Sequence, residues 1–254
     1  MLFVKVCFSQ PEDVKLNKDY LKGYISDTKS ILASPFKWES SDWLKAGIFV
    51  GITAGLYTQD DNIRKWIQKN RSKTTDRISD FARPFGEGIY TVPAIGLLYI
   101  YGDISGNKKA SQTALMSLES FVITGIFTQA IKFTAHRHRP PDSSKKWDGP
   151  SLSLDNLSFP SGHTSSAFSI ASVIASTYKD KPLIPILSYG VATLTGLSRI
   201  NDDKHWASDV FFGAGLGYFI GNAVVNLHTR NSGRLSVVPT IGNAYFGMRV
   251  EYNF

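Results

Sequence analysis

Cysteine is nearly absent from this chain of 254 residues, in which Cys7 is the single example. One cysteine excludes an internal disulfide and a thiolate-rich metal cluster. Cysteine usage therefore says nothing about a reducing or an oxidising compartment. Internal repeats and low-complexity segments are missing as well, which argues against a repeat protein.

Acidic residues are fewer than basic ones, with 21 Asp and Glu against 28 Lys and Arg, which gives a net charge of +7. Such a balance suits nucleic acid, anionic lipid or a small anionic substrate. The basic residues are scattered along the chain, and no nucleic-acid recognition motif is present. We therefore expect no nucleic-acid partner.

Long hydrophobic runs are also scarce, although a membrane-spanning helix needs about 20 mostly apolar residues. Six shorter apolar segments, each bounded by charge or proline, predict an all-α fold, a bundle of about six helices. They are residues 46–59, 88–102, 110–131, 164–178, 182–198 and 210–227. Because the mean hydropathy is −0.10, a soluble helical bundle stays open beside the favoured membrane bundle.

Small residues recur within two of these segments. Gly47, Gly51 and Gly55 lie in the first segment, and the last contains a second series. This second series consists of Gly213, Gly215 and Gly217. Glycines at such spacings predict close contacts between helices.

The two ends of the chain differ from the helical domain, which we place at 43–229. Residues 1–42 form a mixed, charged N-terminal segment, whose apolar start is too short for a complete signal peptide. A signal-peptide remnant and an ordinary lead-in both remain open there. In the tail, 230–254, apolar residues alternate with polar ones from 246 to 254, and Gly242-Asn243 precedes them. This pattern predicts a short C-terminal β-hairpin.

Three separated blocks carry residues that fit a phosphate site. Lys132 and Arg139 are seven residues apart and precede Pro140, where we expect the helix to end and turn. Arg199, at the end of the fifth apolar segment, adds a third cation. An arginine holds two phosphate oxygens at once, which fixes orientation as well as charge.

The second block, Pro160-Ser161-Gly162-His163, directly precedes an apolar segment. This position predicts a helix N-terminus, where backbone N–H groups bind anions and Gly162 allows close approach. The Ser161 hydroxyl offers one more donor. His163 at the same turn is a candidate general acid for the leaving oxygen.

The third block contains His205 and Asp209, four residues apart. On a helix this spacing stacks the two side chains, so that Asp209 orients one ring nitrogen and leaves the other free to attack phosphorus. A phosphohistidine intermediate follows, and three cations neutralise the phosphate without a metal.

Together the blocks read Lys-x6-Arg-Pro, Pro-Ser-Gly-His and Ser-Arg-x5-His-x3-Asp. This sequence resembles the phosphatidic acid phosphatase type 2 and vanadium haloperoxidase superfamily, whose specified motif residues all occur here. The resemblance implies a helical fold with the site at helix ends. It implies a nucleophile at His205, an acid at His163 and a partner at Asp209. It assigns phosphate binding to Lys132, Arg139, Ser161, Gly162 and Arg199.

We therefore predict a metal-independent phosphatase that needs no cofactor. Its expected substrate is a phosphate monoester or pyrophosphate, preferably lipid-linked, such as phosphatidate, phosphatidylglycerophosphate, an isoprenyl pyrophosphate or a lipid A type. We expect a cell-envelope location, in a membrane with the site facing the periplasm or exterior. A soluble periplasmic acid phosphatase and a vanadium-dependent haloperoxidase are the alternatives. His136 and His138 resemble a metal pair, but no carboxylate or cysteine cluster lies near them in sequence.

Overall fold

The computed structural model describes residues 8–9, 16–142, 146–230, 235–242 and 245–253. Within these residues the chain forms eight α-helices, which are α1 Lys18–Leu32, α2 Ser40–Lys69, α3 Lys73–Ala82, α4 Gly88–Ile104, α5 Lys108–Ala135, α6 Gly162–Thr177, α7 Leu183–Asn201 and α8 Ala207–Arg230. Three short 3-10 helices lie at Ser34–Lys37, Arg83–Gly86 and Pro140–Asp142. The all-α prediction is confirmed, and each of the six predicted segments corresponds to one helix, with only residues 178 and 182 just outside. The shorter α1 and α3 were not predicted.

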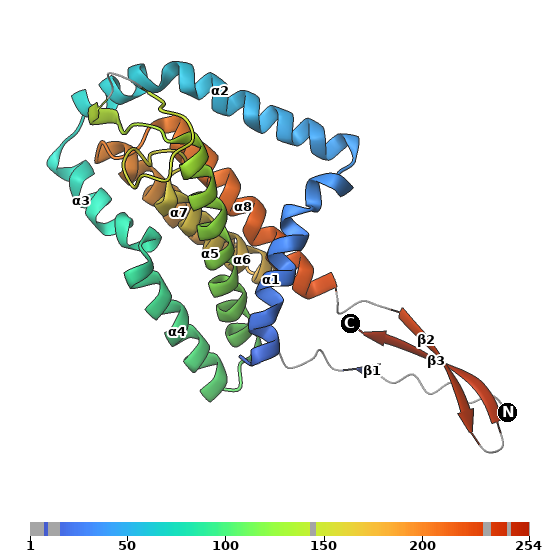
Figure 1. Ribbon diagram of the computed structural model, residues 1–254. Helices are drawn as coiled ribbons and strands as arrows, with labels where there is room; N and C mark the ends of the chain where they lie inside the picture. Colours follow the sequence, from blue (N-terminus) through green and yellow to red (C-terminus); the bar gives the residue numbers. More distant parts are fainter. Residues whose placement is uncertain (1–7, 10–15, 143–145, 231–234, 243–244, 254) are drawn as a thin grey trace.

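The helix α6 lies at the centre of the bundle and packs against α5, α7 and α8 (Figure 1). A cluster of apolar side chains from α1, α5, α6 and α8 fills the space on one side of it. The buried members are Ile31, Met116, Ile123, Val173, Ile220, Val224 and Val225. Burial of this apolar surface stabilises the bundle.

Close packing of α6 on α8 depends on glycine. A Cβ atom on Gly217 would lie 2.2 Å from the Ser165 carbonyl oxygen, and one on Gly221 would lie 2.5 Å from that of Ser169. Real Cβ atoms cannot approach backbone oxygens so closely, so both positions require glycine. The predicted close contact of the last apolar segment is confirmed, and it fixes the register of the two helices that carry the catalytic candidates.

The glycines of α2 behave differently. A Cβ on Gly47, Gly51 or Gly55 would meet no described atom within 4 Å, so the predicted close contact there is wrong. The helix α2 packs on α8 through Phe49 instead. The Phe49 ring lies against Gly215, where an added Cβ would be 2.2 Å from a ring carbon. The glycine series of α2 lies on another face.

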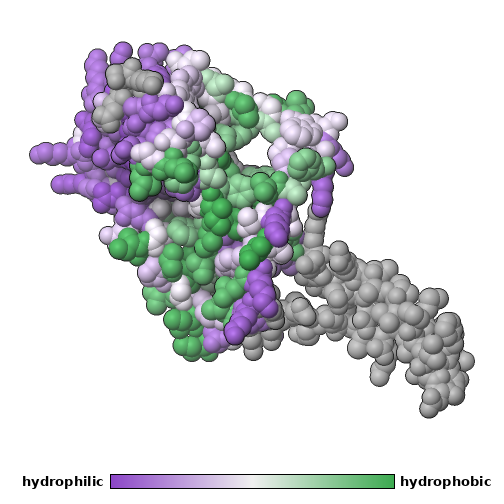
Figure 2. Space-filling model, viewed as in Figure 1, coloured by the Kyte–Doolittle hydropathy of each residue, from purple (hydrophilic) through white to green (hydrophobic). Residues whose placement is uncertain are grey.

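Many large apolar side chains remain exposed on α2, α4 and α7, including Val50, Leu97 and Leu187. Figure 2 shows hydrophobic residues over the middle of the helical body and hydrophilic ones gathered where α2 approaches α3. Among the described helices, α5, α7 and α8 are long and apolar enough to cross a membrane by length and composition. These features indicate a membrane protein.

Three strands lie before the first helix or after the last one along the chain. They are β1 Phe8–Ser9, β2 Leu235–Gly242 and β3 Tyr245–Asn253. The strand β3 pairs antiparallel with β2 and parallel with β1. The predicted turn at Gly242-Asn243 includes residue 243, which lies outside the described residues, and the C-terminal hairpin stays a prediction.

Candidate active site

Lys132 borders the N-terminus of α6. It lies in the last turn of α5, is 9% exposed, and donates a hydrogen bond from its ammonium group to the Leu157 carbonyl. A Cβ on Gly162 would lie 3.9 Å from Lys132 Cε. The structure thus brings a cation of the first block beside the glycine of the second.

The helix α5 ends at Ala135, four residues before Arg139, which is earlier than we predicted. His136 closes the helix in a left-handed conformation with φ of 45°. The chain therefore turns before Arg137, whose side chain enters the interior, and Arg139 lies in the following loop. Proline alone does not set this helix end.

The helix α6 begins at Gly162, with Ser161 as its N-cap, as predicted. Its first intrahelical hydrogen bond runs from the Ser165 N–H to the Ser161 carbonyl (2.9 Å). The amides of residues 162 to 164 therefore have no intrahelical acceptor and suit an anion. The buried Ser161 hydroxyl accepts a hydrogen bond from Thr164 (2.9 Å), which leaves its own proton for a phosphate oxygen.

Two arginines complete the positive charge of the site. Arg199, buried in the last turn of α7, forms an ion pair with Asp202, and Arg139 is exposed. Burial lowers the pKa of His163, and the positive charges of Arg199 and Arg139 lower it further, while Glu87 opposes them. Both arginines therefore act on the same histidine.

His205 is buried and precedes α8, which begins at Ala207 rather than before His205. Its Nδ1 lies 2.8 Å from the Ser158 carbonyl and 3.6 Å from Asp209 Oδ2. Because a carbonyl only accepts, Nδ1 carries the hydrogen and Nε2 keeps its lone pair. The orienting acceptor at hydrogen-bond distance is thus Ser158, which the sequence did not indicate.

Burial lowers the pKa of His205 to about 4, and the charges of Lys132 and Arg139 contribute, whereas Asp209 opposes them. The imidazole is accordingly neutral near pH 7, as a nucleophile requires. The positive charges of the first block therefore help to lower the pKa of the histidine in the third block.

Asp209 is completely buried and fully hydrogen-bonded. Its Oδ2 accepts from the Trp206 backbone N–H (2.9 Å) and from the Ser158 hydroxyl (2.6 Å). The Trp206 contact caps the first turn of α8, which explains why the helix starts after His205. The Asp209 carbonyl also accepts from the Ser161 amide (3.1 Å), which joins the second and third blocks.

An interior ion network behind Asp209 was missed by our sequence analysis. Arg137, which is 0% exposed, donates to Asp209 Oδ1 at 2.5 Å and to Asp60 Oδ2 at 2.6 Å. Asp60, on α2, also accepts from the Ser208 amide (3.0 Å) and hydroxyl (2.6 Å). No motif marks either residue, because Arg137 lies among the variable positions of the first block and Asp60 is 72 residues before it.

The described partner of the His163 side chain is Glu87, with 3.3 Å between His163 Nε2 and Glu87 Oε1. Glu87 also pairs with Arg83 at 3.2 Å. A Cβ on Gly86 would lie 2.5 Å from the His163 carbonyl oxygen. This glycine therefore allows the turn before α4 to touch α6 at the candidate acid, another feature without a sequence signal.

A cavity of about 400 Å³ opens at these residues. Lys132, Gly162 and His163 line it together with apolar side chains of α4 and α5, including Ile89 and Phe121. The candidate phosphate-binding groups thus share one space with apolar surface.

The two histidines of the first block do not form a metal pair among the described residues. His138 Nε2 pairs with Asp148 Oδ2 at 2.7 Å, while the buried His136 caps α5.

Trp206 is buried and packs over Arg137, with 5.4 Å between the guanidinium carbon and the ring centroid. It acts as packing for the ion network.

The chain is similar to several curated phosphatases. It is 31% identical to lipid A 1-phosphatase of Porphyromonas gingivalis over 175 residues, which cover 67% of this chain and 35% of that protein. It is 27% identical to a probable diacylglycerol pyrophosphate phosphatase 1 of Schizosaccharomyces pombe, and this match covers 52% of this chain and 59% of that protein. It is 25% identical to lipid phosphate phosphatase 1 of Arabidopsis thaliana, and this match covers 70% of this chain and 64% of that protein. The matched regions thus cover from about one third to just under two thirds of the length of these relatives.

Two solved structures share the fold. The transmembrane PAP2 type phosphatidylglycerolphosphate phosphatase of Bacillus subtilis superposes with a TM-score of 0.58 at 22% identity, covering 72% of this chain and 93% of that one. LpxE of Aquifex aeolicus superposes with a TM-score of 0.54 at 22% sequence identity, and the match covers 66% of this chain and 94% of that one. Residues 113–232, which contain all three blocks, match the family model of the PAP2 superfamily. Residues 113–232 of this chain therefore belong to the PAP2 superfamily.

Proposed function

We propose that this protein is a metal-independent phosphatase that removes a phosphate from a membrane lipid through a phosphohistidine on His205. The observation that carries the proposal is the hydrogen bond from His205 Nδ1 to the Ser158 carbonyl. It fixes the tautomer, so that the neutral Nε2 is the nucleophile.

In the first step His205 Nε2 bonds to phosphorus as the bond from phosphorus to the leaving oxygen breaks. His163 donates a proton to that oxygen, and the imidazole of His205 becomes cationic. The carboxylate of Asp209, 3.6 Å from Nδ1, stabilises this charge. In the second step His163 takes a proton from water, whose oxygen displaces the phosphate from Nε2.

In the transition state negative charge is spread over the three equatorial phosphate oxygens, and Lys132, Arg139 and Arg199 offset it. The free amides at the start of α6 and the Ser161 hydroxyl add directed donors. Stabilisation of this charge is the main demand of phosphoryl transfer, so these groups replace a metal ion.

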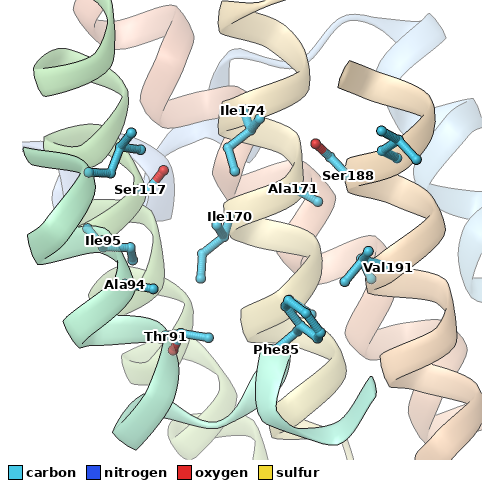
Figure 3. Close-up of a pocket in the computed structure, with 14 residues that line it drawn as sticks. Phe85, Thr91, Ala94, Ile95, Ser117, Ile170, Ala171, Ile174, Ser188 and Val191 are labelled. Atoms are coloured by element: carbon cyan, nitrogen blue, oxygen red, sulfur yellow. The ribbon is translucent and has the colours of Figure 1, made fainter. Parts of the chain in front are cut away.

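A lipid substrate is supported by a second, apolar cavity of about 390 Å³ between α4, α6 and α7 (Figure 3). Phe85, Ile95, Ile170 and Leu187 are among its lining residues. Phe85 directly precedes Gly86, which touches His163. An acyl or isoprenyl chain therefore fits this cavity while its phosphate occupies the charged site. The relatives named for lipid phosphates support the same substrate class.

The test is capture of the covalent intermediate. We expect His163→Asn to accumulate labelled phosphoenzyme from p-nitrophenyl phosphate, because this leaving group needs no acid while the second step lacks its base. The label should resist alkali and be lost in acid, as a phosphoramidate bond is. His205→Asn, the matched control, should carry no label. A labelled His205→Asn protein, or strict dependence on added divalent metal, would refute the mechanism.

A further inference from the structure

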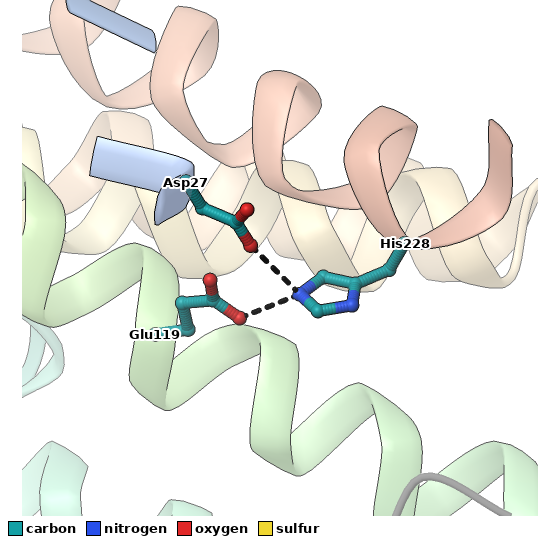
Figure 4. A group of neighbouring side chains, drawn as sticks. All are labelled: Asp27, Glu119 and His228. Carbon is teal, nitrogen blue, oxygen red and sulfur yellow. Dashed lines mark hydrogen bonds and ion pairs between the residues drawn. The ribbon is translucent and has the colours of Figure 1, made fainter. Parts of the chain in front are cut away.

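Three side chains with metal-binding atoms converge between α1, α5 and α8, away from the phosphate site (Figure 4). His228 Nε2 lies 2.7 Å from Glu119 Oε2 and 3.5 Å from Asp27 Oδ2. One ligand atom from each of the three residues lies within 4.8 Å of the other two. These atoms come from three helices far apart in the sequence, so the fold itself assembles the group.

Glu119 is the interior member of this group. Its side chain is 0% exposed, near the middle of α5. Oε2 accepts from the Tyr20 hydroxyl (2.9 Å) and contacts His228, whereas Oε1 has no hydrogen-bond donor among the described residues. A buried carboxylate oxygen without a donor is costly, because burial removes its hydration. Such an oxygen calls for a cation or a proton.

Asp27 is the neighbour that could supply the proton. Burial, and after it the adjacent Glu119, raise the pKa of Asp27 to about 6 against the opposing effects of Ser26 and His228. Tyr20 and Tyr24, which also face Glu119, have their pKa values raised by burial first and by Glu119 next, so they stay neutral.

We propose that Asp27, Glu119 and His228 bind one divalent transition-metal ion, with Zn²⁺ as the best match. An imidazole nitrogen and two carboxylate oxygens are ligands that Zn²⁺ takes at about 2.0–2.2 Å, usually with a fourth ligand completing a tetrahedron. The imidazole disfavours Ca²⁺ and Mg²⁺, which prefer oxygen ligands. Ligand atoms around a metal lie roughly 3–3.5 Å apart, so the Asp27–His228 distance already fits, and the Glu119–His228 contact must open slightly.

The ion would act as a clamp on α1 and would take no part in the reaction. Glu119 precedes Lys132 by 13 positions on α5, which is about 20 Å along the helix axis. Along α1, Leu21, Ile25 and Leu32 are all at least half exposed, and Ile31 is its buried apolar residue. Since apolar burial holds α1 weakly, a metal joining Asp27 to α5 and α8 would stabilise its position.

The test uses the full chain in detergent after treatment with EDTA, with Zn²⁺ as the probe. We expect one Zn²⁺ per chain by elemental analysis. Zinc at about a hundred times its dissociation constant should raise the unfolding temperature by about 5 °C. Protons compete with the metal for these ligand atoms, so the affinity should fall at acid pH.

Asp27→Asn and His228→Gln should each weaken zinc binding by about tenfold or more, since the first removes the charge of one ligand and the second removes the imidazole. His138→Gln is the matched control, because it disrupts a histidine–aspartate pair elsewhere and should bind zinc as the original protein does. Absence of stoichiometric zinc from the unaltered chain would overturn the proposal. So would unchanged binding in both ligand variants. These readouts need no phosphatase activity, so they succeed or fail separately from the proposed reaction.

Discussion

Arg137 Nη1 lies 2.5 Å from Asp209 Oδ1, and both side chains are completely buried. Asp60, equally buried, binds the other end of the same guanidinium at 2.6 Å. This arrangement fixes the carboxylate that faces His205, and it ties α2 to the loop after α5 and to the start of α8. Arg137 therefore positions the candidate nucleophile without contacting the substrate.

Replacing Arg137 with methionine should destabilise the protein by about 3–5 kcal/mol, because two buried carboxylates lose their shared cation. Thermal unfolding in detergent measures this change. Arg64→Met is the matched control. Arg64 pairs with Asp203 at 2.6 Å but is 31% exposed, so its loss should cost about 1 kcal/mol or less. Equal losses in the two variants would contradict an energetic role for the buried network.

The three motifs predicted a phosphate site because each one is local in sequence. Lys132, Ser161, Gly162 and Asp209 are linked in the structure as the motifs led us to expect. Their supporting residues were not predictable in this way. Ser158 accepts from His205 through its backbone carbonyl, which every residue possesses, and no motif marks the hydroxyl that it donates to Asp209.

The fold was predictable to a similar depth. Apolar segments indicated the helices, yet the helix ends depended on side-chain capping and backbone conformation, which hydropathy does not report. The start of α8 is set by Asp209 accepting from the Trp206 amide, and the end of α5 by the left-handed His136. The glycines of α2 misled us because spacing does not say which face a partner covers.

Acid should destabilise the protein through His205. Its pKa is about 4 when folded and 6.5 when unfolded, so between these values the unfolded chain binds a proton that the folded chain does not. Stability from this residue is therefore present above pH 6.5 and declines as the pH falls toward 4. The loss approaches about 3 kcal/mol.

The measurement is the unfolding temperature against pH for the unaltered chain and for His205→Gln, whose difference isolates this histidine. The variant should lose less stability between pH 6.5 and 4. Parallel curves would show that His205 is not buried as a neutral group. The value of kcat/KM should likewise decrease as the pH falls toward 4, because protonation of His205 removes the nucleophilic lone pair.

Gly86→Ala should impair the reaction at the candidate acid. The new methyl group would lie 2.5 Å from the His163 carbonyl oxygen and must push α6 or the preceding turn aside. We expect kcat for a lipid phosphate to fall by about ten- to a hundredfold. With p-nitrophenyl phosphate the loss should be smaller, since that leaving group needs less protonation. Gly96→Ala is the control, because a Cβ there meets no described atom within 4 Å. Equal losses on both substrates would locate the damage elsewhere than at the acid.

Filling the apolar cavity should separate lipid from soluble substrates. Ala94 lines this cavity on α4, so Ala94→Phe would occupy space that we assign to the lipid chain. The KM for a long-chain phosphatidate should rise about tenfold, as lost apolar burial lowers substrate affinity. The KM for p-nitrophenyl phosphate should not change, because the charged site is untouched. Leu97→Phe, 68% exposed on the same helix, is the matched control and should affect neither substrate. If Ala94→Phe left the kinetics of both substrates unchanged, the chain would have to bind along another surface, and the cavity lined by Phe121 and Ile89 would be the next candidate.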